Sequence, residues 1–158
     1  MNNLIGIKRV EQIIIFLNTL DINSERFVKI INSNDQSVIH TFNEALTHSS
    51  YNKDMNYEKL EFFGDAVLRL SASEFIDKKY SNMSVGDRSV LRSQIVSDEW
   101  LTKLGKNIFI DRVINKGSKA INDENANDTI IAETTEALIG AIYKCFNSIK
   151  EVNLWLDS

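Results

Sequence analysis

Apolar residues recur every three or four positions along most of this chain, the spacing that lines one face of an α-helix. Over residues 5–20 an apolar residue appears at positions 7, 10, 13, 14, 17 and 20. Similar patterns predict helices over residues 25–31, 41–47, 57–80, 84–96, 98–106, 129–146 and 149–156. Thr41 is expected to be the N-cap of the third helix, and Ser84 and Asp87 have the spacing of a capping box. The pattern predicts an all-α fold.

Few residues would interrupt these helices. The 158 residues include no proline and six glycines, and the polar segment 117–128 is predicted to be a mobile loop. A chain of this length can bury one substantial core, so we expect a single domain over residues 1–158. No apolar run approaches the roughly 18 residues that a membrane span needs, and we therefore expect no membrane partner.

The composition bears on where the protein is located and on what it can bind. The single cysteine, Cys145, cannot form an internal disulfide, and no signal peptide is recognisable, so we expect a cytoplasmic protein. The formal net charge is −4. Because nucleic-acid-binding surfaces usually have a basic patch, this charge argues against strong nucleic-acid binding.

Three acids lie on one face of the predicted helix over residues 57–80. Glu58, Glu61 and Asp65 are spaced at i, i+3 and i+7 within an otherwise apolar run. Like charges on one face repel, and a cation between them would relieve the repulsion; the alternative is an ordinary solvated face. Gly64 lies mid-helix, where glycine costs about 1 kcal/mol relative to alanine. We therefore expect another group to approach the backbone closely there.

A second acidic pair lies in the predicted helix over residues 129–146. Glu133 and Glu136 are spaced at i and i+3 among apolar residues. Two acidic helix faces become favourable together if they face each other across a hard metal ion.

Three segments resemble motifs of the ribonuclease III family. Residues 45–51, A-L-T-H-S-S-Y, resemble its A-L-T-H-[RK]-S-[YF]. Residues 57–68, Y-E-K-L-E-F-F-G-D-A-V-L, resemble its N-E-R-L-E-F-L-G-D-A-V-L, and residues 132–140, A-E-T-T-E-A-L-I-G, resemble its A-D-x-x-E-A-x-I-G. Gly86-Asp87 and Leu91-Arg92 lie in register between them. The resemblance runs from about residue 40 to the end and implies the all-α, dimeric catalytic domain of that family.

The resemblance implies a site and a reaction. It assigns the metal-binding positions to Glu61, Asp65, Glu133 and Glu136, and Glu58 falls on the family's first acid. Our catalytic candidates are Asp65, Glu136 and Glu58. The implied reaction is Mg²⁺-dependent hydrolysis of double-stranded RNA, with Mn²⁺ as a possible substitute, giving 5′-phosphate and 3′-hydroxyl ends. Divalent cations suit this reaction because they activate water and offset charge in the transition state.

Partners follow from the same resemblance. Phe62, Phe63 and Gly64 are the candidate dimer-interface residues, and one of the two phenylalanines is expected to pack across the two-fold axis of a homodimer. Candidate RNA-binding residues are the basic side chains Arg88, Arg92, Lys116 and Lys119. Each of these four also has an ordinary interpretation as a solvated surface charge.

Two positions depart from the family pattern. Glu133 stands where the family usually has Asp, and Val85 stands where many members have Glu. We expect an active nuclease with an altered metal preference. His48 lies within the first motif and is expected to order a helix junction rather than to bind metal.

Other functions stay open. A catalytically impaired RNA-binding or ribosome-associated module is the second hypothesis, and a helical dimer without an RNA role is the third. The chain ends about where the family usually adds a double-stranded-RNA-binding domain. We therefore expect either a stand-alone, mini-ribonuclease-III-like protein or an excised domain, with weak, salt-sensitive RNA binding.

Overall fold

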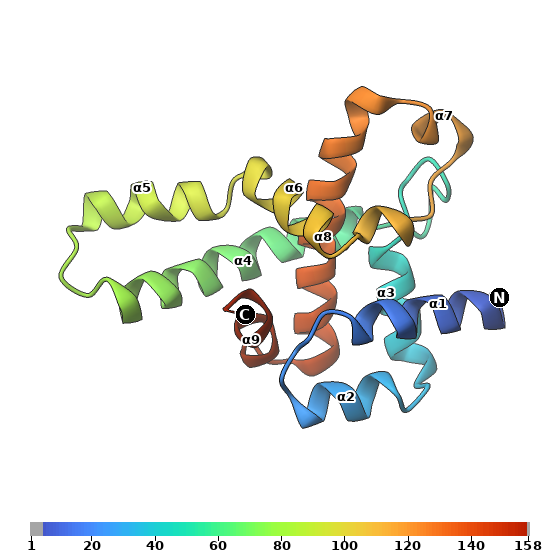
Figure 1. Ribbon diagram of the computed structural model, residues 1–158, viewed down its shortest axis with the longest axis horizontal. Coiled ribbons are helices and arrows are strands. Elements are labelled where there is room, and N and C mark those ends of the chain that lie inside the picture. The colour runs from blue at the N-terminus through green and yellow to red at the C-terminus, as the bar shows by residue number, and fades with distance from the viewer. Residues whose placement is uncertain (1–4, 158) are drawn as a thin grey trace.

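The computed structural model describes residues 5–157, apart from the side chain of Glu124, and within them the regular structure is helical (Figure 1). The ends of the predicted domain, residues 1–4 and 158, lie outside the described residues. The elements are α1 (Ile7–Asn18), α2 (Glu25–Ile31), α3 (Gln36–Ala45), α4 (Glu58–Lys79), α5 (Val85–Ile95), α6 (Asp98–Asn107), the 3₁₀ helix η1 (Ile110–Arg112), α7 (Ser118–Ile121), α8 (Glu124–Phe146) and α9 (Lys150–Leu156). The all-α prediction is confirmed.

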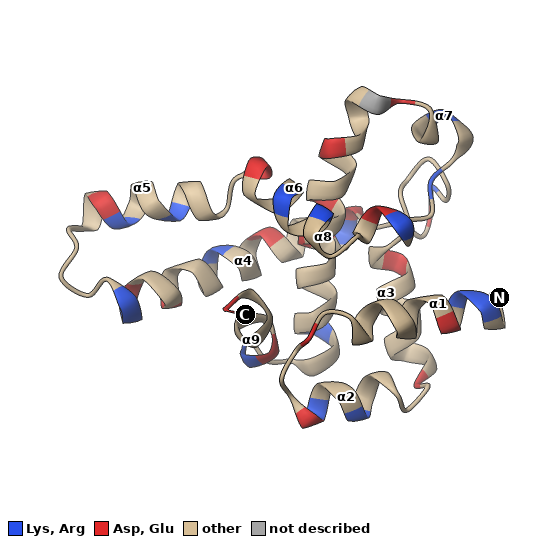
Figure 2. Cartoon of the chain, viewed as in Figure 1, with Lys and Arg blue, Asp and Glu red and all other residues tan. Residues whose placement is uncertain are grey.

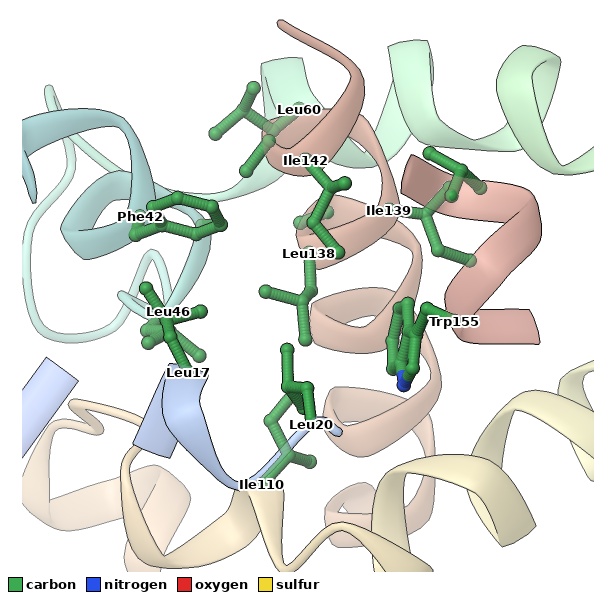
Figure 3. Packing of buried hydrophobic residues seen from close by; sticks show 14 of the residues in the cluster. Leu17, Leu20, Phe42, Leu46, Leu60, Ile110, Leu138, Ile139, Ile142 and Trp155 are labelled. Atoms are coloured by element: carbon green, nitrogen blue, oxygen red, sulfur yellow. The ribbon is translucent and has the colours of Figure 1, made fainter. Parts of the chain in front are cut away.

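Helix α8 forms the centre of the fold. Its residues 137–142 are all buried, so this stretch is enclosed by other helices on every side. In Figure 3, Ile139 faces Trp155 of α9, while Leu138 lies on the side of Leu17 and Leu46. The surrounding helices therefore share one apolar core with α8.

Helices α4 and α8 cross with their backbones in contact. A methyl group on Gly64 would overlap the backbone carbonyl of Glu136, and one on Gly140 would overlap the carbonyl oxygen of Leu60. The expectation of a close backbone approach at Gly64 is therefore confirmed, and the approaching group is α8 of the same chain. The two glycines allow the acidic stretches of α4 and α8 to meet.

The second half of α4 and the whole of α5 extend away from the core as an antiparallel pair (Figure 1). None of the residues of α5 is buried. Ser84 caps α5 by accepting the backbone N–H of Asp87 at 3.2 Å, and its hydroxyl donates to the Asp87 carboxylate at 2.7 Å. The predicted pairing of Ser84 with Asp87 is confirmed, and it fixes the turn between the two helices.

Two predicted boundaries are wrong. Helix α3 begins at Gln36, not near Thr41, because Asp35 accepts the backbone N–H of Ser37 at 2.8 Å and caps the helix six residues earlier than predicted. Thr41 instead donates its hydroxyl to the carbonyl oxygen of Ser37. The predicted mobile loop over residues 117–128 contains α7 and the start of α8, since Asp123 accepts the N–H groups of residues 125 and 126.

Within the described part of the chain, no helix is both long enough and apolar enough to cross a bilayer.

Candidate active site

The crossing of α4 and α8 brings the predicted acids into one neighbourhood. Burial raises the pKa of Glu61, and the charges of Glu133 and Glu58 raise it further. Burial also raises the pKa of Glu136 to about 7, with Asp65 the next largest cause. Acids from both helices therefore repel one another in half-buried positions, as the sequence pattern led us to expect.

Two of these acids have hydrogen-bond partners within the chain. Arg69, one turn along α4, donates its Nε–H to both carboxylate oxygens of Asp65 at 2.9 Å. Tyr57 donates its hydroxyl to Oε2 of Glu133. Among the described residues, no three Asp, Glu, His or Cys side chains converge closely enough to hold an ion.

The donor set nevertheless fits a hard divalent cation. Carboxylate oxygens are the ligands that Mg²⁺ prefers, and a cation would remove the repulsion that raises the pKa of Glu61 and Glu136. The Arg69–Asp65 pair lies at the surface, where a bound cation would compete with Arg69 for Asp65. Glu58 is exposed at the first residue of α4 and lies outside the half-buried group.

Sequence reasoning missed Tyr57 and Asp98. Tyr57 is 2% exposed, and its ring meets the His48 ring edge-on at 5.4 Å. Asp98, the first residue of α6, adds to the charges that raise the pKa of Glu136. Tyr57 precedes the first acid of α4, but its contact with Glu133 spans 76 residues, so no local pattern indicated it.

His48 orders a junction between chain segments. Ser50 donates its backbone N–H to Nδ1 of His48 at 3.1 Å, and the Ser50 hydroxyl lies 2.6 Å from the same nitrogen. That hydroxyl also accepts the backbone N–H of Gly117 at 2.9 Å. Burial lowers the pKa of His48, although the charge of Glu133 raises it. The contacts agree with the structural role predicted for His48.

The four predicted RNA-binding residues do not form one group. Arg88 and Arg92 lie on α5. Lys119 lies in α7 and Lys116 lies just before it, at the opposite end of the view in Figure 1. Lys and Arg are spread over most helices rather than confined to one (Figure 2). Lys119 is exposed.

The other three have intramolecular partners. Arg88 pairs with Asp77 at 2.7 Å and donates to the carbonyl of Met83 at 3.0 Å, which holds the turn between α4 and α5. Arg92 donates to the Ser73 hydroxyl at 3.1 Å, and Lys116 donates to the side-chain oxygen of Asn127 at 2.7 Å. For Arg88 these contacts favour the structural interpretation over the RNA-binding one.

The residues predicted for a dimer interface differ in exposure. Phe62 is 84% exposed, whereas Phe63 packs against Tyr143 with 5.5 Å between ring centroids. Gly64 is buried at the crossing with α8 of the same chain. Its lack of a side chain therefore serves packing within one chain rather than a contact between chains. Val85, the departure noted on α5, is 84% exposed.

The motifs and the carboxylate-lined crossing have a counterpart in known proteins. A family model described as "Ribonuclease-III-like" matches residues 39–152. The chain belongs to the ribonuclease III-like family. All four acids of the crossing lie within the matched region of this ribonuclease III-like chain.

Curated relatives are longer than this ribonuclease III-like chain. "Ribonuclease 3" of Prochlorococcus marinus is 46% identical over 155 residues, which is 98% of this chain and 62% of that protein. "Ribonuclease 3 2" of Synechocystis sp. is 38% identical over 113 residues, 72% of this chain and 46% of that protein. The chain therefore spans about half to two thirds of the length of these relatives.

Solved structures agree with the ribonuclease III fold. The nuclease domain of ribonuclease III from Campylobacter jejuni matches with a TM-score of 0.70 and 28% identity, covering 94% of each chain. A second structure of that domain matches with a TM-score of 0.69 and 28% identity, covering 99% of this chain and 96% of that one. The first is described as having structural flexibility in a region involved in dimer formation. The predicted family and nuclease-domain fold are confirmed.

Proposed function

We propose that the chain is a Mg²⁺-dependent endoribonuclease that cleaves double-stranded RNA and leaves 5′-phosphate and 3′-hydroxyl ends. One observation carries the proposal: at the crossing of α4 and α8, burial and the charges of neighbouring acids from both helices raise the pKa of Glu61 and Glu136. The similarity to proteins named ribonuclease 3 supports the same reaction class. A cytoplasmic location remains a prediction.

Each of the two helices would supply two carboxylate ligands. Glu61 and Asp65 would hold the cation from α4, and Glu133 and Glu136 would hold it from α8; Arg69 donates to Asp65 from the next turn of α4. When bound, Mg²⁺ offsets charge on the phosphate and makes water a better nucleophile. The close contact at Gly64 and Gly140 sets how far apart α4 and α8 carry these acids.

The test uses a labelled RNA duplex at low salt with Mg²⁺, Ca²⁺ or EDTA. We expect cleavage with Mg²⁺ only, and a loss of about 100-fold or more in Glu136→Gln, which keeps the shape and removes the charge. Glu99→Gln is the matched control, because Glu99 is an exposed acid paired with Lys103 on α6. Cleavage by Glu136→Gln at the wild-type rate would refute the assignment.

A second candidate function is RNA binding without cleavage. It is favoured by Glu133, which replaces the usual Asp, and by the exposed Val85 in place of Glu. Duplex binding in Mg²⁺ or Mn²⁺ with no cleavage in either would support this candidate instead.

A further inference from the structure

Glu133 meets in space a further departure from the family motifs, Tyr57, which the sequence analysis did not single out. Tyr57 occupies the position of Asn in N-E-R-L-E-F-L-G-D, and Glu133 occupies the position of Asp in A-D-x-x-E. They are 76 residues apart in sequence, yet the Tyr57 hydroxyl donates to Oε2 of Glu133. A longer acid thus coincides with a donor that reaches it.

Tyr57 is held in place by contacts that do not involve the acidic side chains. Its backbone N–H donates to the carbonyl of Thr47 at 2.9 Å, and its own carbonyl accepts the N–H of Glu61 at 2.8 Å. The ring is almost fully buried and lies edge-on to His48. With backbone and ring both held, the hydroxyl has a defined position beside α8.

Glu133 needs such an anchor more than an aspartate would. Its extra methylene can move the carboxylate by up to ~1.5 Å and adds a rotatable bond. It also faces a charge on α4, since Glu133 and Glu61 repel each other. A hydrogen bond to one carboxylate oxygen restrains that bond, leaves the other oxygen available, and stabilises the negative charge.

We infer that Tyr57 is a positioning residue for Glu133: its hydroxyl holds one carboxylate oxygen so that the other can bind the divalent cation, and the Tyr57–Glu133 pair acts as a unit. This inference rests on the proposed function for the identity of the site. It concerns cation binding rather than cleavage, so the two can be tested separately. Removing a residue that hydrogen-bonds to a metal ligand typically weakens metal binding about 10- to 100-fold.

The experiment measures the affinity of the RNA-free protein for Mn²⁺, from the electron paramagnetic resonance signal of the free ion. Tyr57→Phe keeps the buried ring and removes only the hydroxyl, and we expect it to bind Mn²⁺ 10- to 100-fold more weakly. Tyr80→Phe is the matched control at the far end of α4, where Tyr80 packs against Phe75, and it should bind as the wild type does.

A double-mutant cycle tests whether the two residues act as a unit. In a Glu133→Asp background the shorter acid is too short to keep the Tyr57 contact, so adding Tyr57→Phe should change Mn²⁺ affinity less than 2-fold. If Tyr57→Phe alone binds Mn²⁺ as tightly as the wild type or more tightly, the inference is overturned. It is also overturned if Tyr57→Phe weakens Mn²⁺ binding by the same factor in the Glu133→Asp background as in the wild type. The same cycle obtained with a wild type that does not cut RNA would support the inference and refute the proposed nuclease.

Discussion

Glu136 has the environment least favourable to a negative charge among the four acids at the helix crossing. Burial raises its pKa, and the charges of Asp65 and Glu61 act in the same direction, so the pKa reaches about 7. Arg69 lowers it only in part. A carboxyl group with such a pKa is partly protonated at neutral pH in the metal-free protein, and a cation would restore its charge.

This raised pKa predicts how stability varies with pH in EDTA. The pKa of Glu136 is 4.5 in the unfolded state and about 7 in the folded state, so the folded state keeps this proton to a higher pH. The contribution of Glu136 to the free energy of unfolding is therefore fully present below pH 4.5 and is lost as pH rises through 7. Because Glu136 is only half-buried, we expect the loss to be ~1 kcal/mol rather than the full value implied by the shift.

Urea unfolding at pH 5, 6 and 7.5 measures this effect as the difference between the wild type and Glu136→Gln. Glutamine does not titrate, so the variant should gain stability relative to the wild type as pH rises. Parallel profiles would show that the environment of Glu136 is ordinary.

The acids could be predicted from sequence because their spacing and motifs are local, whereas the partner of Glu133 could not. Asp65 and Arg69 are i, i+4 neighbours, and their pairing is visible in a helical pattern. Tyr57 looks like a core aromatic at a helix start, and its bond to Glu133 exists only because α4 crosses α8. Contacts of this kind depend on the tertiary fold and leave no periodic trace in the sequence.

At the scale of elements, the site depends on how closely α4 and α8 approach. Glycine at positions 64 and 140 removes the side chains that would separate the two helices. The cost of glycine within a helix, about 1 kcal/mol each, is offset by packing along the longest helix pair of the fold. The separation of the helices, and so the spacing of the acids, is set by these two residues.

We expect Gly64→Ala to destabilise the protein by about 3 kcal/mol or more, because the added methyl group would overlap the backbone of α8 rather than a movable side chain. Gly86→Ala is the matched control. It lies in exposed α5, where the nearest atom to a methyl group is the Ser84 hydroxyl at 3.9 Å. That variant should be neutral or gain ~0.5 kcal/mol. Urea unfolding distinguishes them; equal stabilities would refute the role of the crossing.

Periodicity located most of the helices but not all of their ends. The apolar pattern placed α4, α5, α6 and α9 within a few residues of their observed bounds. It missed the start of α3 because two polar residues, Asp35 and Thr41, could each cap a helix, and only the structure shows that Asp35 does so. Likewise, the polar segment before α8 looked like a loop, although Asp123 can start a helix whatever the polarity of the residues that follow.

At the scale of the whole molecule, one large apolar side chain beside the acids remains uncovered. Phe62 follows Glu61 directly on α4 and is 84% exposed, although an aromatic residue typically buries 150 Å² or more when it is packed. Phe63, the next residue, has its partner Tyr143 within the chain. We propose that Phe62 packs against a second copy of the chain, as the sequence resemblance implies, which would place two acidic sites in one assembly.

Substituting Phe62 by Asp should therefore convert a dimer into a monomer of 18.0 kDa without unfolding it. The exposed position predicts a change in unfolding free energy of the monomer within about 0.5 kcal/mol, while a charge placed in an apolar interface should weaken association at least 10-fold. Sedimentation velocity over a range of concentrations measures the mass. Ile7→Asp is the matched control, because Ile7 is 79% exposed on α1. A monomeric wild type, or a Phe62→Asp variant that still dimerises, would refute this interface.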